Sequence, residues 1–277
     1  MDYELIDSGN LRRLEKFGKF ILDRPDPDCL WNKTLSESEW QKADAIYLRS
    51  AIDKGYWKKK HNFPERWEIN HNNLKFNLRL SPFKHTGCFP EQSWEWDFIQ
   101  ENTNDCFKLL NLFGYTGVAS LAGLVGGAEV THVDASRPSI TWFKENQSLS
   151  GLNDRKARVI LDDALKFTER EIKRGNRYDG VVMDPPSFGH GPKGETWNFK
   201  DHFPQLLNNV LKLLSDSSKF VIANAYAVST SHITLFNLLN DVLVKERGGR
   251  VESGELMLDE TASGKKISTG IFAIWRS

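Results

Sequence analysis

Residues 180–189 read Gly180-Val181-Val182-Met183-Asp184-Pro185-Pro186-Ser187-Phe188-Gly189, an apolar run that ends in an aspartate and two prolines. Proline lacks the N–H that a strand ladder needs, and it favours extended geometry in the residue before it. A buried strand is therefore expected to end at Asp184, in a rigid loop that holds a carboxylate beside the aromatic ring of Phe188. Such a loop suits the binding of a flat polar group at the carboxyl edge of a parallel sheet.

Strand and helix patterns alternate along the chain on both sides of this loop. Seven strands are expected, at residues 107–113, 129–134, 158–161, 179–184, 219–225, 251–258 and 268–275. Helices are expected between most of them, including one that begins after the N-cap Ser136. This alternation predicts an α/β fold with a doubly wound parallel sheet. Only a loop joins the last two strands, so they are expected to form a carboxyl-terminal antiparallel hairpin on that sheet.

The amino-terminal part of the chain is rich in aromatic and charged residues. We expect a helix from Ser36 to about Lys54, because Glu39 follows Ser36 at the spacing of a capping box. An exposed loop is expected at residues 57–61 and a β-hairpin at residues 67–80. The chain is accordingly divided into a small α+β accessory region, residues 1–100, and a main domain, residues 101–277.

Bulk composition narrows the class of protein. Lysine plus arginine and aspartate plus glutamate both total 37, so the net charge is zero and gives no support to whole-surface attraction for nucleic acid. Cys29, Cys88 and Cys106 are widely separated, which is typical of a reduced intracellular protein and provides no metal-ligand spacing. Neither a signal peptide nor an apolar run of ~18 residues is evident. We therefore expect a cytoplasmic protein with no metal and no membrane partner, and its oligomeric state stays open.

The first strand-to-helix turn of the main domain is rich in glycine and reads Leu112-Phe113-Gly114-Tyr115-Thr116-Gly117. Gly114 lets the backbone turn and approach a ligand, and Gly117 lets the helix begin close to the sheet. Asp134 ends the second strand, twenty positions after Gly114. At that spacing an acidic side chain accepts hydrogen bonds from ribose hydroxyls. The alternative is a tight turn followed by an aspartate that caps a helix.

The nucleotide that this edge would bind is expected to lack phosphates. Bulky Tyr115 stands between the two glycines, and no phosphate-cradling loop with a lysine occurs in the chain. S-adenosylmethionine, which has a ribose and no phosphate, is the leading candidate. Asp162-Asp163-Ala164 follows the third strand, where a carboxylate could accept from an adenine amino group or simply favour a helix amino terminus.

These segments together resemble the class I S-adenosylmethionine-dependent methyltransferases, whose sheet is Rossmann-like. The chain is most similar to the bacterial family that includes the 23S rRNA cytosine-5 methyltransferases, and within it to a branch without an assigned substrate. The resemblance covers roughly residues 66 to 277. It includes a segment similar to the family's turn before the catalytic domain, a turn that helps to close the cofactor pocket. In this chain the segment reads Lys84-His85-Thr86-Gly87-Cys88-Phe89-Pro90-Glu91-Gln92.

The resemblance implies that S-adenosylmethionine is the cofactor and assigns roles to individual residues. The glycine turn would surround the methionine part, Asp134 would bind the ribose and Asp163 would meet the adenine. The cofactor-binding set is Phe89, Gln92, Phe113, Gly114, Tyr115, Thr116, Gly117, Asp134, Ala135, Ser136, Asp163, Ala164 and Asp184. Asp184 and Pro185 would face the transferring methyl group, and Phe188, which could stack on a base swung out of its helix, completes the catalytic set.

Two departures from the relatives bear on mechanism. Cytosine-5 transfer needs a cysteine thiolate that attacks the ring, and in the rRNA enzymes this cysteine lies just after the fifth strand. Here that place holds Ala223-Asn224-Ala225-Tyr226, so a methyl transfer without a cysteine nucleophile is expected. The small RNA-binding domain that many relatives carry is also not recognisable at the amino terminus.

Three functions remain open from the sequence. The favoured one is methylation of an RNA base, which the family likeness implies to be ribosomal, with RNA as partner. Methylation of a small molecule or a protein side chain is the alternative, and a non-catalytic binding module is the third. Residues 190–197 are interpreted as a substrate lid, in which Trp197 is either a stacking surface or a hydrophobic anchor. Short basic runs at residues 58–60, 155–158 and 265–266 could touch phosphates or be ordinary solvated surface.

Overall fold

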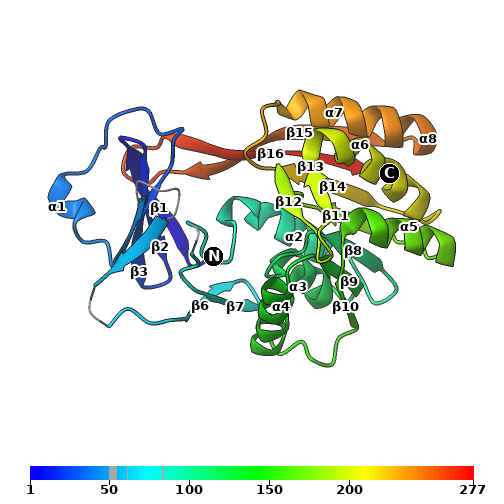
Figure 1. Ribbon diagram of the computed structural model, residues 1–277, viewed down its shortest axis with the longest axis horizontal. Coiled ribbons are helices and arrows are strands. Elements are labelled where there is room, and N and C mark those ends of the chain that lie inside the picture. The colour runs from blue at the N-terminus through cyan, green and yellow to red at the C-terminus, as the bar shows by residue number, and fades with distance from the viewer. Residues whose placement is uncertain (50–54, 61, 83) are drawn as a thin grey trace. The chain divides into compact units, whose positions relative to one another are not determined.

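A computed structural model describes residues 1–49, 55–60, 62–82 and 84–277 (Figure 1). The chain folds into two compact units. The first comprises Met1–Ser93 together with Met257–Thr269, and the second comprises Trp94–Leu256 together with Gly270–Ser277. These two units differ in their bounds from the predicted division after residue 100, which stays a proposal about domains.

The second unit is built on a seven-stranded sheet, and this confirms the predicted fold class. Its strand order is β10-β9-β8-β11-β14-β16-β15, and β16 runs antiparallel to β14 while β10, β9, β8, β11 and β14 are parallel. The strands are β8 (Lys108–Leu112), β9 (Glu129–Asp134), β10 (Ala157–Leu161), β11 (Gly180–Met183), β14 (Phe220–Ala225), β15 (Arg250–Asp259) and β16 (Lys266–Arg276). Each begins and ends within two residues of its predicted bounds.

Helices cover both faces of this sheet (Figure 1). They are α2 (Ser93–Glu101), α3 (Val118–Val125), α4 (Arg137–Leu149), α5 (Ala164–Arg174), α6 (Phe199–Leu213), α7 (His232–Leu239), the π-helix η2 (Asn240–Val244) and α8 (Lys245–Arg247). Helices α3 and α4 pack together, as do α5 and α6. The four central strands are buried because they are covered on both sides, which explains their near-continuous apolar sequences.

The first unit is a five-stranded sheet with a separate hairpin. Its strands are β1 (Tyr3–Gly9), β2 (Arg12–Phe17), β3 (Phe20–Pro25), β4 (Ala45–Arg49) and β5 (Gly55–Lys59), paired in that order. The hairpin consists of β6 (Trp67–His71) and β7 (Leu74–Leu78), as predicted. Two short helices complete the unit, α1 (Glu37–Trp40) and the 3₁₀-helix η1 (Pro90–Gln92).

Two expectations for the first unit were wrong. The helix from Ser36 lasts only through α1, and residues 45–49 form β4 because they pair with β3 and β5. The hydroxyl of Ser36 contacts Ser38 Oγ at 2.8 Å instead of capping the helix. The expected loop at residues 57–61 is in β5 as far as Lys59, although its lysines are exposed; His61 and residues 50–54 lie outside the described residues.

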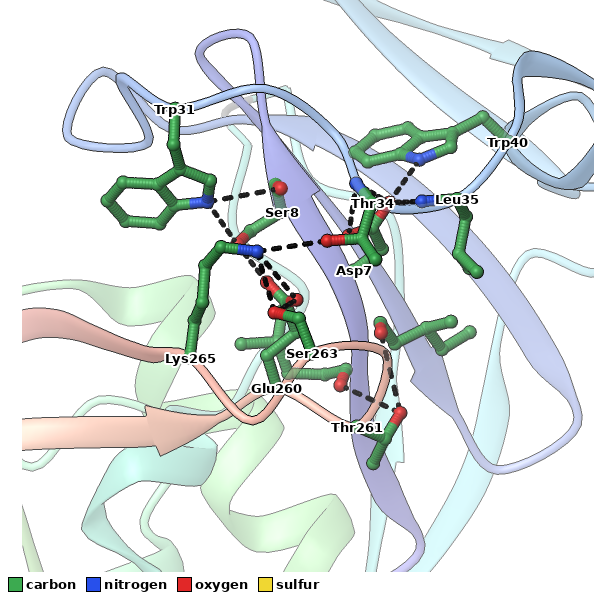
Figure 2. A network of polar contacts seen from close by, with 12 residues as sticks. Asp7, Ser8, Trp31, Thr34, Leu35, Trp40, Glu260, Thr261, Ser263 and Lys265 are labelled. Carbon is green, nitrogen blue, oxygen red and sulfur yellow. Dashed lines mark hydrogen bonds and ion pairs between the residues drawn. The ribbon is translucent and has the colours of Figure 1, made fainter.

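A polar network fastens the tip of the β15–β16 hairpin into the first unit (Figure 2). Ser8 Oγ donates to the carboxylate of Glu260, and it accepts from Trp31 Nε1 at 3.0 Å. Lys265 Nζ donates to Thr34 Oγ1 at 2.9 Å. Residues more than 200 positions apart in the sequence are therefore joined by one buried hydrogen bond, from Ser8 to Glu260, and one exposed hydrogen bond, from Lys265 to Thr34.

Within the described part of the chain, no helix is long and apolar enough to cross a membrane.

Candidate functional site

The carboxyl ends of four neighbouring strands meet at one edge of the seven-stranded sheet. Backbone hydrogen bonds join them: Gly114 N donates to Val133 O at 2.9 Å, and Asp162 N donates to Asp134 O at 3.0 Å. Asp184 N donates to Leu112 O at 3.3 Å. The structure therefore brings the glycine turn, Asp134, the Asp162–Ala164 segment and Asp184 to the same edge. This is the edge at which ligands bind in open α/β sheets.

The glycine turn has an unusual backbone. Phe113 and Tyr115 adopt left-handed conformations with φ of 57° and 49°, and Gly117 has φ of 87°. Non-glycine residues rarely take positive φ, and such residues cluster at functional sites. The turn is held from behind, because Asn146 Nδ2 on α4 donates to Thr116 O at 3.0 Å. A strained turn of this kind presents its backbone N–H groups in fixed directions.

Both glycines of the turn are required by close packing. A Cβ atom on Gly114 would lie 2.3 Å from His132 Cε1, and one on Gly117 would lie 2.0 Å from Phe143 Cδ2. The rings of His132 and Phe143 stack with centroids 4.1 Å apart and planes 10° apart. The turn therefore rests on a pair of stacked rings, which sequence reasoning missed. A histidine inside the predicted second strand, two residues before Asp134, was the available signal.

Asp134 is held in place by the turn itself. Its Oδ2 accepts from Tyr115 N at 2.8 Å, and its Oδ1 accepts from Ser136 N at 2.7 Å. Burial raises the pKa of Asp134 above its ordinary value, and the two backbone N–H groups act against this shift. Each carboxylate oxygen takes only one of these N–H groups and keeps capacity for another donor. Its role in binding the ribose hydroxyls of the cofactor stays a prediction, and this remaining capacity is what that role would use.

The residues after Asp134 and β10 begin helices as predicted. Ser136 Oγ accepts from Ser139 N at 3.3 Å and caps α4. Asp163 Oδ1 accepts from Lys166 N at 3.0 Å and caps α5, in which buried Ala164 is the first residue. The Asp163 side chain therefore caps a helix, as one of its two predicted roles required. Its contact with adenine, the other predicted role, stays a prediction. A groove beside these helix starts is lined by residues that include Ala135, Leu161, Asp162 and Pro192.

The loop after β11 continues into a small two-stranded hairpin, β12 (Phe188–His190) and β13 (Thr196–Asn198). Trp197 is 3% exposed, its Nε1 donates to Pro186 O at 2.7 Å, and its ring packs on Phe113 with centroids 4.8 Å apart. Trp197 is therefore the hydrophobic anchor of the predicted lid and not a stacking surface. Phe188 stays 57% exposed at the base of the hairpin.

Asp184 is partly buried and Pro185 is buried, directly before this exposed ring. The carbonyl of Pro186 accepts from Trp197, and the role of Asp184 at the site stays a prediction. An ion pair of 2.6 Å between Lys166 Nζ and Glu195 ties the hairpin to α5. The loop thus combines a carboxylate, a fixed backbone and an exposed aromatic surface.

The segment Ala223–Tyr226, which was compared with the cysteine position of the relatives, contains a buried amide. Asn224 in β14 is 1% exposed, and its Nδ2 donates to Glu95 Oε2 on α2 at 2.7 Å. Cys106 precedes β8, at the opposite end of the strand from the site edge, while Cys29 and Cys88 belong to the first unit. Phe89 and Gln92 also belong to the first unit, and their roles stay predictions.

Comparison with known proteins identifies the family. A family model described as S-adenosylmethionine-dependent methyltransferase matches residues 49–232, more than half of the chain. The chain belongs to this family. Its predicted resemblance, its enzymatic activity as a methyltransferase and its cofactor, S-adenosylmethionine, are thereby confirmed.

Solved structures and curated relatives agree with this assignment. The S-adenosylmethionine-dependent methyltransferase from Agrobacterium tumefaciens has a TM-score of 0.95 at 39% identity, over 100% of this chain and 90% of that one. The structure of SMU.776 with S-adenosylhomocysteine shares the fold, with a TM-score of 0.73 at 18% identity over 99% of this chain and 75% of that one.

Among curated proteins, the ribosomal RNA large subunit methyltransferase K/L of Shewanella frigidimarina is 32% identical over 152 residues. The matched part is 54% of this chain and 21% of that protein, so the chain spans about a fifth of the length of this relative.

Proposed function

We propose that this methyltransferase modifies a base of RNA and does so without a cysteine nucleophile. The observation that carries the proposal is the exposed ring of Phe188 on the loop that also holds Asp184 and that Trp197 anchors. A base taken out of a stack needs an aromatic surface and a polar acceptor at the same place. The name of the curated relative, a ribosomal RNA methyltransferase, supports RNA as the substrate class.

The arrangement favours a nitrogen or oxygen atom as the methyl acceptor. Carbon-5 of a pyrimidine becomes nucleophilic only after a thiolate adds to the ring. The segment in which the resemblance would put that cysteine holds Ala223, Asn224, Ala225 and Tyr226. A nitrogen or oxygen lone pair needs no such activation. The chain's task is then to align this lone pair with the methyl group and to accept a proton as positive charge develops on the acceptor.

The residues at the carboxyl edge of the sheet have separate roles in this reaction. The cofactor supplies an electrophilic methyl group on a sulfonium. Asp134 holds its ribose, and the strained turn from Phe113 to Gly117 fixes the remaining part with backbone groups. Asp184 accepts a hydrogen bond from the N–H of the target base and takes up the proton that the reaction releases. Phe188 stacks on the base and keeps its acceptor atom in line.

We further propose that the protein acts in the cytoplasm, where ribosomal RNA is available to it. Because the net charge is zero, affinity for RNA would come from local contacts around the site and not from the whole surface.

The decisive experiment is mass mapping of modified nucleosides in RNA from cells with and without the gene. We expect one base methylation to disappear and to return with the wild-type gene but not with Asp184→Asn, which keeps the shape and removes the proton acceptor; removal of a general base typically lowers the rate by about 10²–10⁴-fold. An unchanged RNA profile, with methyl transfer to a small molecule or protein, would overturn the RNA assignment.

Phe188→Ala tests the stacking role with the purified protein. Loss of a base–aromatic stack costs about 1–3 kcal/mol, so KM for the RNA should rise while the affinity for S-adenosylmethionine stays unchanged. Ile233→Ala is the matched control, because Ile233 is 51% exposed on α7 and has no assigned role. Equal effects of the two substitutions would remove Phe188 from the site.

A further inference from the structure

His132 is a fully buried histidine directly behind the cofactor turn. It is 0% exposed in the middle of β9, and its Nδ1 lies 3.0 Å from Ser120 Oγ on α3. Ser120 Oγ in turn accepts from Asn111 Nδ2 on β8 at 2.8 Å. Three elements that converge on the turn are thus linked by one short chain of buried hydrogen bonds.

His132 Nδ1 and Ser120 Oγ share one buried hydrogen bond. Ser120 Oγ has a second lone pair besides the one that accepts from Asn111, so it can form this bond with either tautomer of the ring. Burial lowers the pKa of His132 to about 3, and a hydrogen bond with the backbone of Tyr115 acts against this shift. At neutral pH the imidazole is therefore uncharged, with one face stacked on Phe143.

The position of this ring determines where the turn can lie. Gly114 sits so close to the imidazole that a Cβ atom would meet Nδ1 at 2.4 Å. The next residue, Tyr115, donates its N–H to Asp134 at 2.8 Å. A displacement of the ring would consequently move the Gly114–Tyr115 backbone and the carboxylate that this backbone orients.

We propose that His132 is a positioning residue for S-adenosylmethionine: its ring, held by Ser120, sets the place of the Gly114–Tyr115 backbone and thereby the orientation of Asp134 toward the ribose. The inference rests on the proposed assignment of this turn and of Asp134 to the cofactor. The competing explanation is an ordinary core histidine, whose replacement lowers stability and leaves the geometry of the turn intact.

Two conservative substitutions separate these explanations. In His132→Asn the side-chain amide can lie near the position of Nδ1 and keep a hydrogen bond with Ser120. His132→Phe keeps a flat ring and removes that hydrogen bond. We expect His132→Phe to weaken S-adenosylmethionine binding by about tenfold, which corresponds to 1.4 kcal/mol, and His132→Asn to recover most of this loss. Kd is measured by isothermal titration calorimetry, and KM for the cofactor should rise with little change in kcat.

Ser120→Ala provides a milder variant that leaves the ring in place. It removes the hydrogen-bond partner of His132 Nδ1, and loss of one buried hydrogen bond should raise Kd by about fivefold. Thr168→Val is the matched control: it removes a buried bond of 3.1 Å from Asn209 between α5 and α6, and it should lower Tm without changing Kd.

The inference is overturned if the His132 and Ser120 variants lower Tm as Thr168→Val does and leave Kd within about twofold of the wild type. Failure of His132→Asn to recover any affinity lost in His132→Phe would also overturn it, because a general packing defect has that signature. Asp134→Ala separates this failure from failure of the site itself. If Asp134→Ala weakens cofactor binding and the His132 variants do not, the site assignment stands and only the role of His132 is lost.

Discussion

Two aspartates, one in each unit, have pKa values shifted in opposite directions. Asp7 in the first unit is 0% exposed, and burial alone would raise its pKa. Its carboxylate accepts from Leu35 N at 2.8 Å, Trp40 Nε1 at 2.8 Å and Thr34 N, and these donors bring the pKa below its ordinary value. Asp134 in the second unit accepts from only two backbone N–H groups, and burial keeps its pKa raised.

The difference separates a structural carboxylate from one that is prepared for a ligand. Asp7 has donors on both oxygens and is surrounded by the fold, so its charge is stabilised by protein groups (Figure 2). The two N–H groups offset only part of the effect of burial on the Asp134 carboxylate. This is expected of a group whose remaining hydrogen-bond donors come from a bound molecule. The network around Asp7 should therefore govern stability, and Asp134 should govern affinity.

The largest effect is expected where the turn beside Asp134 is packed most tightly. Gly117→Ala places a Cβ atom in the ring of Phe143 at positive φ; left-handed strain costs about 1–2 kcal/mol and overpacking about 1–3 kcal/mol. We expect a loss of about 2–5 kcal/mol in the free energy of unfolding, measured by urea denaturation. Gly175→Ala is the control, because Gly175 also has positive φ but no neighbour within 4 Å. Equal losses would show that backbone strain, and not the stacked rings, requires glycine at position 117.

Asp7→Asn tests the structural carboxylate. The amide replaces one acceptor oxygen by a donor that faces backbone and indole N–H groups, and loss of a hydrogen bond to a charged group costs about 1.5–3 kcal/mol. The affinity for S-adenosylmethionine of the folded variant should not change. The wild type should also lose stability as pH falls below the ordinary aspartate pKa of 3.8, because the unfolded chain takes up the proton more readily than Asp7 does. Asp2→Asn, at an exposed carboxylate, is the control. If Asp7→Asn is as stable as the wild type, the contrast between a structural Asp7 and a ligand-binding Asp134 does not hold.

Asp134→Asn should show the reverse pattern and the smallest change in stability. Loss of one charged acceptor for the ribose should weaken cofactor binding by about tenfold, while the free energy of unfolding stays close to that of the wild type. Because the pKa of Asp134 is raised, the folded state binds this proton more tightly, and the contribution of Asp134 to stability falls as pH rises through that raised pKa. Calorimetric titration and urea denaturation of the same sample measure both quantities. A large loss of stability with unchanged affinity would make Asp134 structural, like Asp7.

Sequence reasoning was most successful where structure is determined locally. The strands of the second unit, the N-cap at Ser136 and the edge that joins the glycine turn, Asp134 and Asp184 were all predicted. Tyr115 and Asp134 are only 19 positions apart, within one strand–turn–helix–strand unit. In contrast, Ser8 and Glu260 are 252 positions apart, and no pattern around either residue indicates the other.

The failures have the same physical origin. Residues 45–49 were predicted as helix from a capping pattern, but their pairing with β3 and β5 makes them a strand, since tertiary contacts override local propensity. Trp197 was left as either a stacking surface or an anchor, and only its bond to Pro186 and its contact with Phe113 decide between them. The partners of Asn224 and His132 come from other elements and were not predicted.

The sequence by itself determined the seven strands of the second unit, the glycines of the turn and the carboxylates at the strand ends, because prolines, glycines and hydrophobic periodicity act over a few residues. Only the tertiary structure decided that the tip of the last hairpin completes the first unit, that the turn rests on the rings of His132 and Phe143, and that Asp7 and Asp134 differ in their remaining capacity for donors. These features depend on burial and on contacts between distant segments, which exist only once the chain is packed.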